Sequence, residues 1–191
     1  MMQPVRLGIA MCGSFCTFSD VLAVLRALPR ERYALVPILS EASFSTDTRF
    51  SPAAQVRAQL EQICGRQVVH TLAQAEPIGP KKLLDVLAVV PCTGNTLAKL
   101  ANGITDTPVT LAVKAHLRNE RPVVIAVSTN DALASAGKNI GALLNYKNIY
   151  FVPMKQDDCI NKPRSVVADF IKIPETVEAA LLGRQIQPVI S

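Results

Sequence analysis

Small, neutral polar side chains gather in one short stretch of the sequence, PCTGNTLAKLANGITDTP, which runs from Pro91 to Pro108. The apolar run LLDVLAVV precedes it, and an amphipathic helical pattern follows. An aliphatic strand that ends in a hydroxyl, a glycine and an amide before a helix is typical of a ligand-binding turn, because helix N-termini offer free backbone N–H groups. Thr93, Gly94 and Asn95 are therefore candidate binding residues.

A second hydroxyl-rich turn, MCGSFCTFSD, follows the first run with a strand pattern. Gly13 allows the backbone to turn tightly, and Ser14 lies near the start of the next helix, where the helix dipole suits a phosphate. The stretch is neither GxGxxG nor a Walker A loop, since it has a single glycine and no lysine. Taken alone, the stretch fits an ordinary strand-to-helix turn with a hydroxyl cap better than a phosphate site. Ser40, after the second strand pattern, is a weaker candidate for the same phosphate.

Strand and helix patterns alternate along the chain and predict an α/β fold. We expect a three-layer α/β/α, Rossmann-like (flavodoxin-like) open parallel sheet of about six strands, because nearly pure aliphatic runs such as PVVIAVS are buried on both faces. The expected strands cover residues 5–12, 33–40, 67–72, 85–91, 122–128 and 148–153, and the expected helices cover 18–28, 52–64, 95–104, 108–120, 136–146 and 165–185. Ligands of such sheets bind beyond the carboxyl ends of the strands, so the polar turns should meet there.

Length and composition fit a single domain that spans residues 1–191. The hydrophobic share of 49% against 18% charged residues excludes a disordered chain. No apolar run is long enough to cross a bilayer and no signal-peptide pattern is present, so we expect no membrane association and a cytoplasmic location.

The charge and cysteine content exclude two further classes of protein. The net charge of +5 invites a nucleic-acid partner, but the basic residues are scattered among acidic ones and tryptophan is absent, so none is expected. The five cysteines lack metal-ligand spacing, so no metal site is expected.

The stretch from Pro91 to Asp106 resembles the signature of the homo-oligomeric flavin-containing cysteine decarboxylases. The matching positions are Pro91, Asn95, Thr96, Lys99, Ala101, Asn102, Gly103, Ile104 and Asp106, with Thr93 in place of a serine. In that family this turn holds the ring of FMN, and the turns after the first two strands hold its phosphate. The resemblance implies FMN contacts from Gly13, Ser14 and Ser40 on the phosphate side, from Thr93, Gly94, Asn95 and Thr96 on the ring side, and from Phe15 and Asn130.

Two catalytic features of the decarboxylases are missing from this sequence. Their histidine upstream of the signature has no counterpart, because its position falls near Pro77 while His70 and His116 lie elsewhere. Their second signature, Pro-x-Met-Asn-x-x-Met-Trp, is replaced by STNDALA, which keeps only Asn130. The flavin-binding fold is therefore expected without the decarboxylase chemistry.

Blocks along the whole chain resemble a narrower family, the flavoprotein-like B subunits of dipicolinate synthase from spore-forming bacteria. These blocks are GSFCTF, STDTRF, AEPIGPKKLLD, TGNTLAKLANGITDTPV, NERPVVIAVSTNDAL, KNIYFVPMKQDDCINKP and SVVADF. The resemblance implies an oxidoreductase that, with an A subunit, oxidises a tetrahydrodipicolinate-type precursor to pyridine-2,6-dicarboxylate (dipicolinate) during sporulation, in the mother cell. It also implies FMN on this chain, NADP on the A subunit, and a homo-oligomer built from one or more trimers.

A cyclic dicarboxylate substrate would require cations and a base at the site. The polar stretches STNDAL and MKQDDCINKPRS follow strand patterns and could form its rim. The weak catalytic candidates are Asn130, Asp131 and Asp158, Asp157 is a further candidate base, and Lys155, Lys162 and Arg164 are candidates for binding the substrate carboxylates. Each of them also fits a solvated loop position.

The sequence also predicts the roles of two cysteines and leaves two alternative functions open. Cys92, inside the flavin turn, is expected to be a small buried filler, and no catalytic role is expected for Cys159. An FMN-dependent decarboxylase and a non-catalytic scaffold for the A subunit remain alternative functions.

Overall fold

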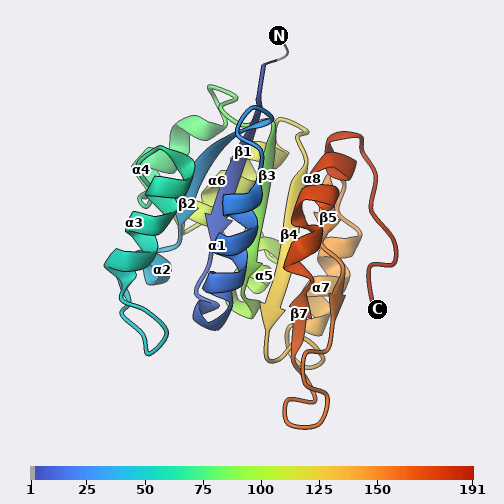
Figure 1. The fold of residues 1–191 in the computed structure, drawn as a ribbon. Helices are drawn as coiled ribbons and strands as arrows, with labels where there is room; N and C mark the ends of the chain where they lie inside the picture. The colour runs from blue at the N-terminus through green and yellow to red at the C-terminus, as the bar shows by residue number, and fades with distance from the viewer. Residues whose placement is uncertain (1–2) are drawn as a thin grey trace.

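A mainly parallel β-sheet forms the middle layer of the fold, with helices on both of its faces (Figure 1). The structure is a computed structural model that describes residues 3–191. Its strands are β1 (Val5–Met11), β2 (Tyr33–Leu39), β3 (Val86–Cys92), β4 (Val123–Thr129), β5 (Ile149–Phe151), β6 (Met154–Lys155) and β7 (Val166–Ala168). Its α-helices are α1 (Phe18–Ala27), α2 (Glu41–Ser45), α3 (Ala53–Cys64), α4 (Leu72–Ala75), α5 (Gly94–Ala101), α6 (Pro108–Leu117), α7 (Gly137–Leu144) and α8 (Ile173–Leu181). The predicted three-layer α/β/α architecture is confirmed.

The parallel strands lie in the order β2-β1-β3-β4-β5. The chain adds β2 on one side of β1 and then crosses over to add β3 on the other side. This is the flavodoxin-like order, in which ligands bind where the direction of strand addition reverses, between β1 and β3. Every residue of β3 is buried, as expected for a strand in the middle of a covered sheet.

Alternating side chains of the strands divide the interior into two apolar layers. In β3, Val86, Ala88 and Val90 pack with α1, α3 and α8, whereas Leu87 and Val89 pack with α5, α6 and α7 on the other face (Figure 1). No helix in residues 3–191 has the length and apolar character that crossing a membrane requires.

Two sequence predictions differ from the structure, both at the edges of the sheet. The expected strand 67–72 makes a single bridge, from Val69 to Ile38 of the edge strand β2, and then gives way to α4. The expected helix 165–185 begins instead with β7, which pairs antiparallel with the carboxyl end of β4. Its valines favour a strand when a sheet edge is available to pair with.

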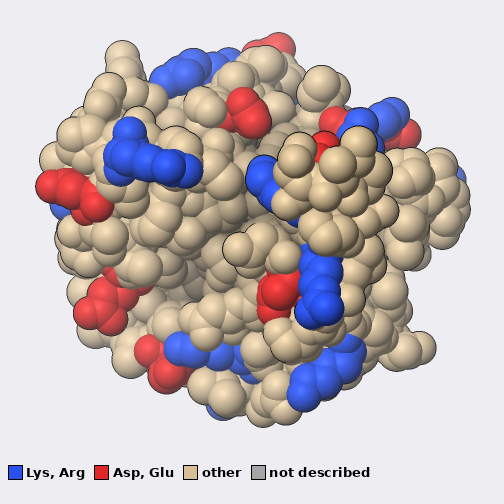
Figure 2. Space-filling view, turned by 90° about the horizontal axis from the view of Figure 1, so that it is seen from below, with Lys and Arg blue, Asp and Glu red and all other residues tan. Residues whose placement is uncertain are grey.

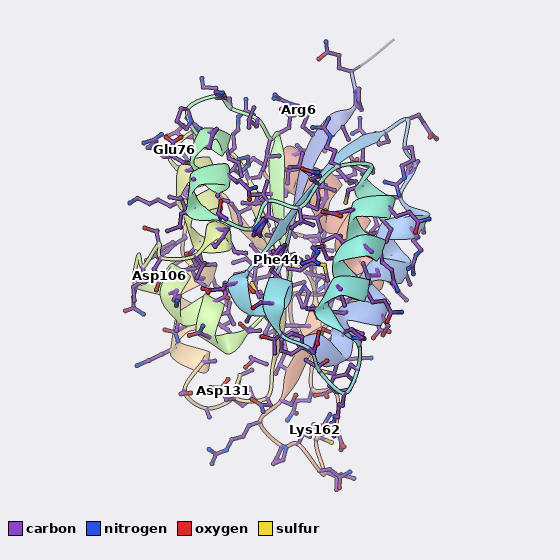
Figure 3. The ribbon with its side chains drawn as sticks, turned by 90° about the vertical axis from the view of Figure 1, so that its left-hand side faces the viewer. Arg6, Phe44, Glu76, Asp106, Asp131 and Lys162 are labelled. Atoms are coloured by element: carbon purple, nitrogen blue, oxygen red, sulfur yellow. The ribbon has the colours of Figure 1, made fainter. Side chains whose placement is uncertain are left out.

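Ion pairs connect neighbouring segments at the amino-terminal edge of the sheet. The carboxylate of Asp85 accepts hydrogen bonds from the backbone N–H of Arg6 at 2.9 Å and from its Nε at 3.0 Å, and it lies 3.3 Å from Nη1 of Arg121. The hydrogen bond from the Arg6 side chain is the main reason that the pKa of Asp85 lies below its usual value. In Figure 3, Arg6 lies at the opposite end of the molecule from Asp131 and Lys162, so this charge cluster is remote from the polar turns.

A buried histidine lies near the same edge, at the end of α6. His116 is 1% exposed, and its Nε2 has no hydrogen-bond partner among residues 3–191. Burial lowers the pKa of His116 to about 4, and the nearby cation of Arg121 acts in the same direction. The ring is therefore neutral at neutral pH.

The free energy of unfolding should fall as the pH drops from about 6.5 towards 4, because the unfolded chain binds a proton on His116 that the folded protein excludes. The stabilisation that comes from the neutral ring of His116 is complete above the pKa of this histidine in the unfolded chain. Its loss at low pH lowers the free energy of unfolding by at most ~3 kcal/mol. Urea unfolding followed by circular dichroism across this range measures the slope. His116→Phe should flatten it, and an unchanged slope in that variant would assign the effect to other groups.

Candidate functional site

A cavity of about 850 Å³ opens at the carboxyl ends of β1, β3 and β4. It therefore lies at the point where the direction of strand addition reverses. Figure 2 looks onto this edge and shows the surface hollowed near its middle, with basic and acidic side chains around the hollow. The loop before α3 and the hairpin between β6 and β7 complete its walls.

The cavity brings together most of the residues predicted from the sequence. Those from the turns after β1, β3 and β4 are Gly13, Ser14, Phe15, Thr93, Gly94, Asn95, Asn130 and Asp131. They come from three turns that are far apart in the sequence, and the parallel sheet places these turns at one edge.

A hydroxyl pair joins the turn after β1 to the end of β4. Ser14 Oγ and Ser128 Oγ lie 2.7 Å apart, and the hydroxyl of Thr17 donates to the backbone carbonyl of Ser14 at 2.9 Å. Ser14 precedes a short 3₁₀ turn (Phe15–Thr17) that leads directly into α1. The first N–H groups of this helical segment thus lie at the cavity wall, where a helix favours an anion.

The turn after β3 approaches β4 very closely at Gly94. A β-carbon at this position would lie 2.8 Å from both Thr129 Oγ1 and Asp131 Oδ1, so the turn has no room for a side chain. Thr93 caps α5 by accepting a hydrogen bond from the N–H of Thr96 at 3.3 Å. The register of β3 against β4 shifts between Val89 and Cys92, directly before this turn.

The carboxylate of Asp131 is held by hydroxyl groups of its own turn. It accepts hydrogen bonds from Ser135 and from Thr129. These two hydrogen bonds, that of Ser135 first, lower the pKa of Asp131 below its usual value. Asp131 is therefore ionised at neutral pH and faces the cavity beside Gly94.

The β6–β7 hairpin contributes a second carboxylate and a cation. Lys162 Nζ lies 3.1 Å from Asp157 Oδ2, and both residues line the cavity. Burial opposes the ionisation of Asp157, but hydrogen bonds from Ser165 and Lys162 outweigh it and lower its pKa. The two labelled residues Asp131 and Lys162 lie at the same lower end of the molecule in Figure 3.

Five predicted site residues do not line the cavity, and two of them are the candidate carboxylate-binding residues Lys155 and Arg164. Ser40 caps the short helix α2, accepting a hydrogen bond from the N–H of Ser43 at 3.2 Å, and lies behind the turn after β1. Thr96 is 7% exposed because its side chain faces inward under the turn after β3. Asp158 points into its own loop, where it accepts a hydrogen bond from the N–H of Asn161 at 2.9 Å.

Other lining residues were not named individually in the sequence predictions. They are Cys16, Thr17, Arg49, Phe50, Ser128, Thr129, Ser165 and Val167. Ser128, Thr129 and Ser165 lie within the polar stretches STNDAL and MKQDDCINKPRS, which were expected to form the rim. Arg49 and Phe50 belong to a loop whose direction depends on tertiary packing, and no local pattern marks them.

The cysteines differ in exposure and therefore in reactivity. Cys12 and Cys92 are fully buried, and burial raises the pKa of Cys12 to about 11 and that of Cys92 well above its usual value. Both are thiols at neutral pH, which agrees with the expected filler role of Cys92. Cys16 and Cys159 are exposed, and only Cys16 lines the cavity.

The cavity combines neutral hydroxyl and amide donors with two ionised carboxylates and the cations of Arg49 and Lys162. Within residues 3–191, no group of three or more His, Cys, Asp or Glu side chains is placed to hold a metal ion. Such a lining can bind a polar, partly anionic ligand and can accept a proton.

Gly94→Ala should lower the free energy of unfolding by about 1–3 kcal/mol, because the new methyl group must force Thr129 and Asp131 apart. Gly141→Ala is the matched control: it lies within α7 with nothing within 4 Å of its β-carbon, and it should stabilise the protein by up to about 1 kcal/mol. Urea denaturation measures both changes. Equal effects of the two substitutions would contradict the close approach at Gly94.

Known proteins resemble the chain over nearly its whole length. The family model described as "Flavoprotein" matches residues 1–177. The dipicolinate synthase B subunit of Bacillus subtilis (strain 168) is 42% identical over 185 residues, which cover 97% of this chain and 92% of the relative. The crystal structure of the dipicolinate synthase B subunit from Bacillus halodurans C is 41% identical and superimposes with a TM-score of 0.90, covering 100% of this chain and 98% of that one.

A more distant solved structure shares the fold. Burkholderia xenovorans DmrB in complex with FMN, described as a cubic protein cage for redox transfer, is 20% identical with a TM-score of 0.64 and covers 80% of this chain and 89% of that one. The family match and the solved B subunit agree with the α/β fold of the chain. The chain therefore belongs to the flavoprotein family, in which it is related to the dipicolinate synthase B subunits.

Proposed function

We propose that this chain binds FMN in the cavity and works with an A subunit as a dipicolinate synthase, oxidising a tetrahydrodipicolinate-type precursor to dipicolinate during sporulation. The observation that carries the proposal is the convergence of the turns after β1, β3 and β4 on one cavity at the β1/β3 reversal. The identity to B subunits of dipicolinate synthase supports the subunit role, and the FMN complex of DmrB supports the cofactor.

The residues at the cavity fit FMN. The backbone of Gly94 packs directly against Thr129 and Asp131, so the β3 turn lies at the cavity wall without a side chain of its own at this position. Asn95 and the N–H groups of that turn offer neutral donors to a ring that becomes electron-rich on reduction. Ser14 and the first N–H groups of the helical segment after β1 suit the phosphate.

We assign the cofactor contacts to the residues that line the cavity. The proposed contacts are Gly13, Ser14 and Phe15 on the phosphate side, Thr93, Gly94 and Asn95 on the ring side, and Asn130. Ser40 and Thr96 act indirectly in this proposal, because they fix the turns through helix caps.

Bound FMN would supply an acceptor for two electrons, and the chain itself would supply binding and proton transfer. The amides of Asn95 and Asn130 can orient cofactor and substrate, since both line the cavity and are exposed. Asp131 and Asp157 are the carboxylates of the lining. Both are ionised at neutral pH and so can accept a proton, although their lowered pKa values make them weak bases.

The wider assembly belongs to the same proposal. NADP would bind to the A subunit, and the chain would act in the cytoplasm of the mother cell. We also propose that it assembles into a trimer or a multiple of trimers, which agrees with the description of DmrB as a cubic cage. The decarboxylase alternative finds no support at the cavity, because no histidine of residues 3–191 lines it.

Asn95→Asp should weaken FMN binding about tenfold or more, because it places a carboxylate beside a ring that attracts hydrogen-bond donors. Flavin absorbance of the purified chain and fluorescence titration with FMN measure the affinity. Gln55→Glu makes the same amide-to-carboxylate change on the exposed surface of α3, outside the cavity lining, and should leave the affinity unchanged. Equal affinities of the wild type and Asn95→Asp would move the flavin site elsewhere.

Mixing the chain with a dipicolinate synthase A subunit should give a stable complex that forms dipicolinate faster than either subunit alone. Size-exclusion chromatography detects the complex, and the ultraviolet absorbance of the aromatic product measures the rate. Full activity of the A subunit alone would remove any catalytic role from this chain. A complex that forms without FMN and whose activity does not respond to Asn95→Asp would favour the scaffold alternative.

A further inference from the structure

One cation of the cavity lining is not compensated by a neighbouring acid. Of the two lining cations, Lys162 is paired with Asp157 at 3.1 Å. Arg49 forms no ion pair and no side-chain hydrogen bond with any of residues 3–191. Its five N–H donors are therefore available to a ligand that enters the cavity.

The loop that carries Arg49 is held firmly against the start of α3. The hydroxyl of Thr48 accepts hydrogen bonds from the N–H of Phe50 at 3.2 Å and of Ser51 at 3.4 Å, which closes a tight turn around Arg49. Asp47 fixes the end of the loop by accepting a hydrogen bond from the N–H of Ala53 at 2.8 Å. The backbone of Arg49 is thus preorganised although its side chain is exposed.

The side chain of Arg49 is also positioned. Its guanidinium lies over the ring of Phe50, 4.9 Å from the ring centroid, and both residues line the cavity. Phe50 is 52% exposed, so part of its ring remains uncovered at the cavity wall. A planar guanidinium next to an exposed aromatic surface is suited to a flat ring that bears a carboxylate, since the fork binds the carboxylate and the ring packs on the aromatic side chain.

We propose that Arg49 is the specificity-determining residue that binds a carboxylate of the ring-shaped dicarboxylate, with Phe50 packing against the ring. This inference rests on the function proposed above and adds to it the residue that selects the substrate class. Lys162 contributes less, because its charge is already shared with Asp157. Arg49 could also bind the phosphate of FMN, which is an anion like the carboxylate. The experiment therefore measures the affinities for FMN and for the dicarboxylate separately.

Calorimetric titration of the full chain with dipicolinate, with pyridine-2-carboxylate and with FMN tests the proposal. Arg49→Gln should weaken dipicolinate binding about tenfold to a hundredfold, since a charged hydrogen bond is lost. Arg49→Lys should recover part of the affinity, because it keeps the charge and loses the fork. FMN affinity should be unchanged in both variants. Pyridine-2-carboxylate should bind the wild type more weakly than dipicolinate.

Arg57→Gln is the matched control. Arg57 lies on α3 with its guanidinium 4.6 Å from the ring centroid of Phe44, so its loss removes one positive charge and one stack on an aromatic ring outside the cavity lining. Dipicolinate affinity should be unchanged in this variant. The melting temperature of each variant shows that it is folded, and Arg49→Lys serves as the test if Arg49→Gln does not fold.

Three results would overturn the assignment. The first is no dipicolinate binding by the wild type, with or without FMN; the second is equal dipicolinate affinity in Arg49→Gln and the wild type. The third is a loss of FMN affinity in Arg49→Gln with dipicolinate affinity retained, which would make Arg49 a phosphate ligand. Failure of the wild type to bind FMN would instead contradict the proposed function, and the dipicolinate titration remains interpretable without the flavin.

Discussion

The architecture of the cavity depends on the close contact between the turn after β3 and the end of β4. At Gly94 the two segments approach so closely that a single β-carbon would lie 2.8 Å from the hydroxyl of Thr129 and from the carboxylate of Asp131. The Ser14–Ser128 hydroxyl pair ties the turn after β1 to the same strand end. These contacts join three strand ends into one wall, and they leave backbone and small polar groups, not bulky side chains, at its surface.

In the part of the chain that the structure describes, polar groups are paired or buried at the amino-terminal edge of the sheet, whereas several are exposed and unpaired at the carboxyl edge. At the amino-terminal edge, Asp85 is saturated by Arg6 and Arg121, and His116 is buried in its neutral form. At the carboxyl edge, the lining keeps exposed amides and a guanidinium, Arg49, that no acid neutralises in residues 3–191. Free polar groups cost stability when buried, so they persist where a ligand or water can reach them.

The β6–β7 hairpin extends the cavity beyond what the parallel strands alone would form. Because β7 pairs antiparallel with the last residues of β4, the hairpin between β6 and β7 must project past the edge of the sheet. It carries Asp157, Lys162 and Ser165 to the cavity wall. The antiparallel addition thus supplies a carboxylate and a cation beside Asp131 and Arg49, which come from loops of the parallel part.

The sequence predicted the layered α/β fold and most of the strand-end residues for a local physical reason. Buried parallel strands need continuous aliphatic runs, and the turns that follow need glycine, hydroxyl and amide side chains, so Thr93, Gly94 and Asn95 could be recognised in place. Ser40 and Thr96 were predicted as binding residues, but Ser40 caps α2 and Thr96 is buried and donates its backbone N–H to the cap Thr93. A capping hydroxyl and a ligand-binding hydroxyl look alike in a sequence.

The sequence alone therefore determined which elements form and which turns follow the strands, because hydrophobic period and turn chemistry act over a few residues. Only the tertiary structure decided that 166–168 pairs with β4 as a strand, that Arg49 and Phe50 reach the cavity, and that Asp158 turns away from it. Those outcomes depend on which sheet edge and which loop each segment meets in the folded chain. The residues in such contacts lie far apart in the sequence, so no local pattern predicts them.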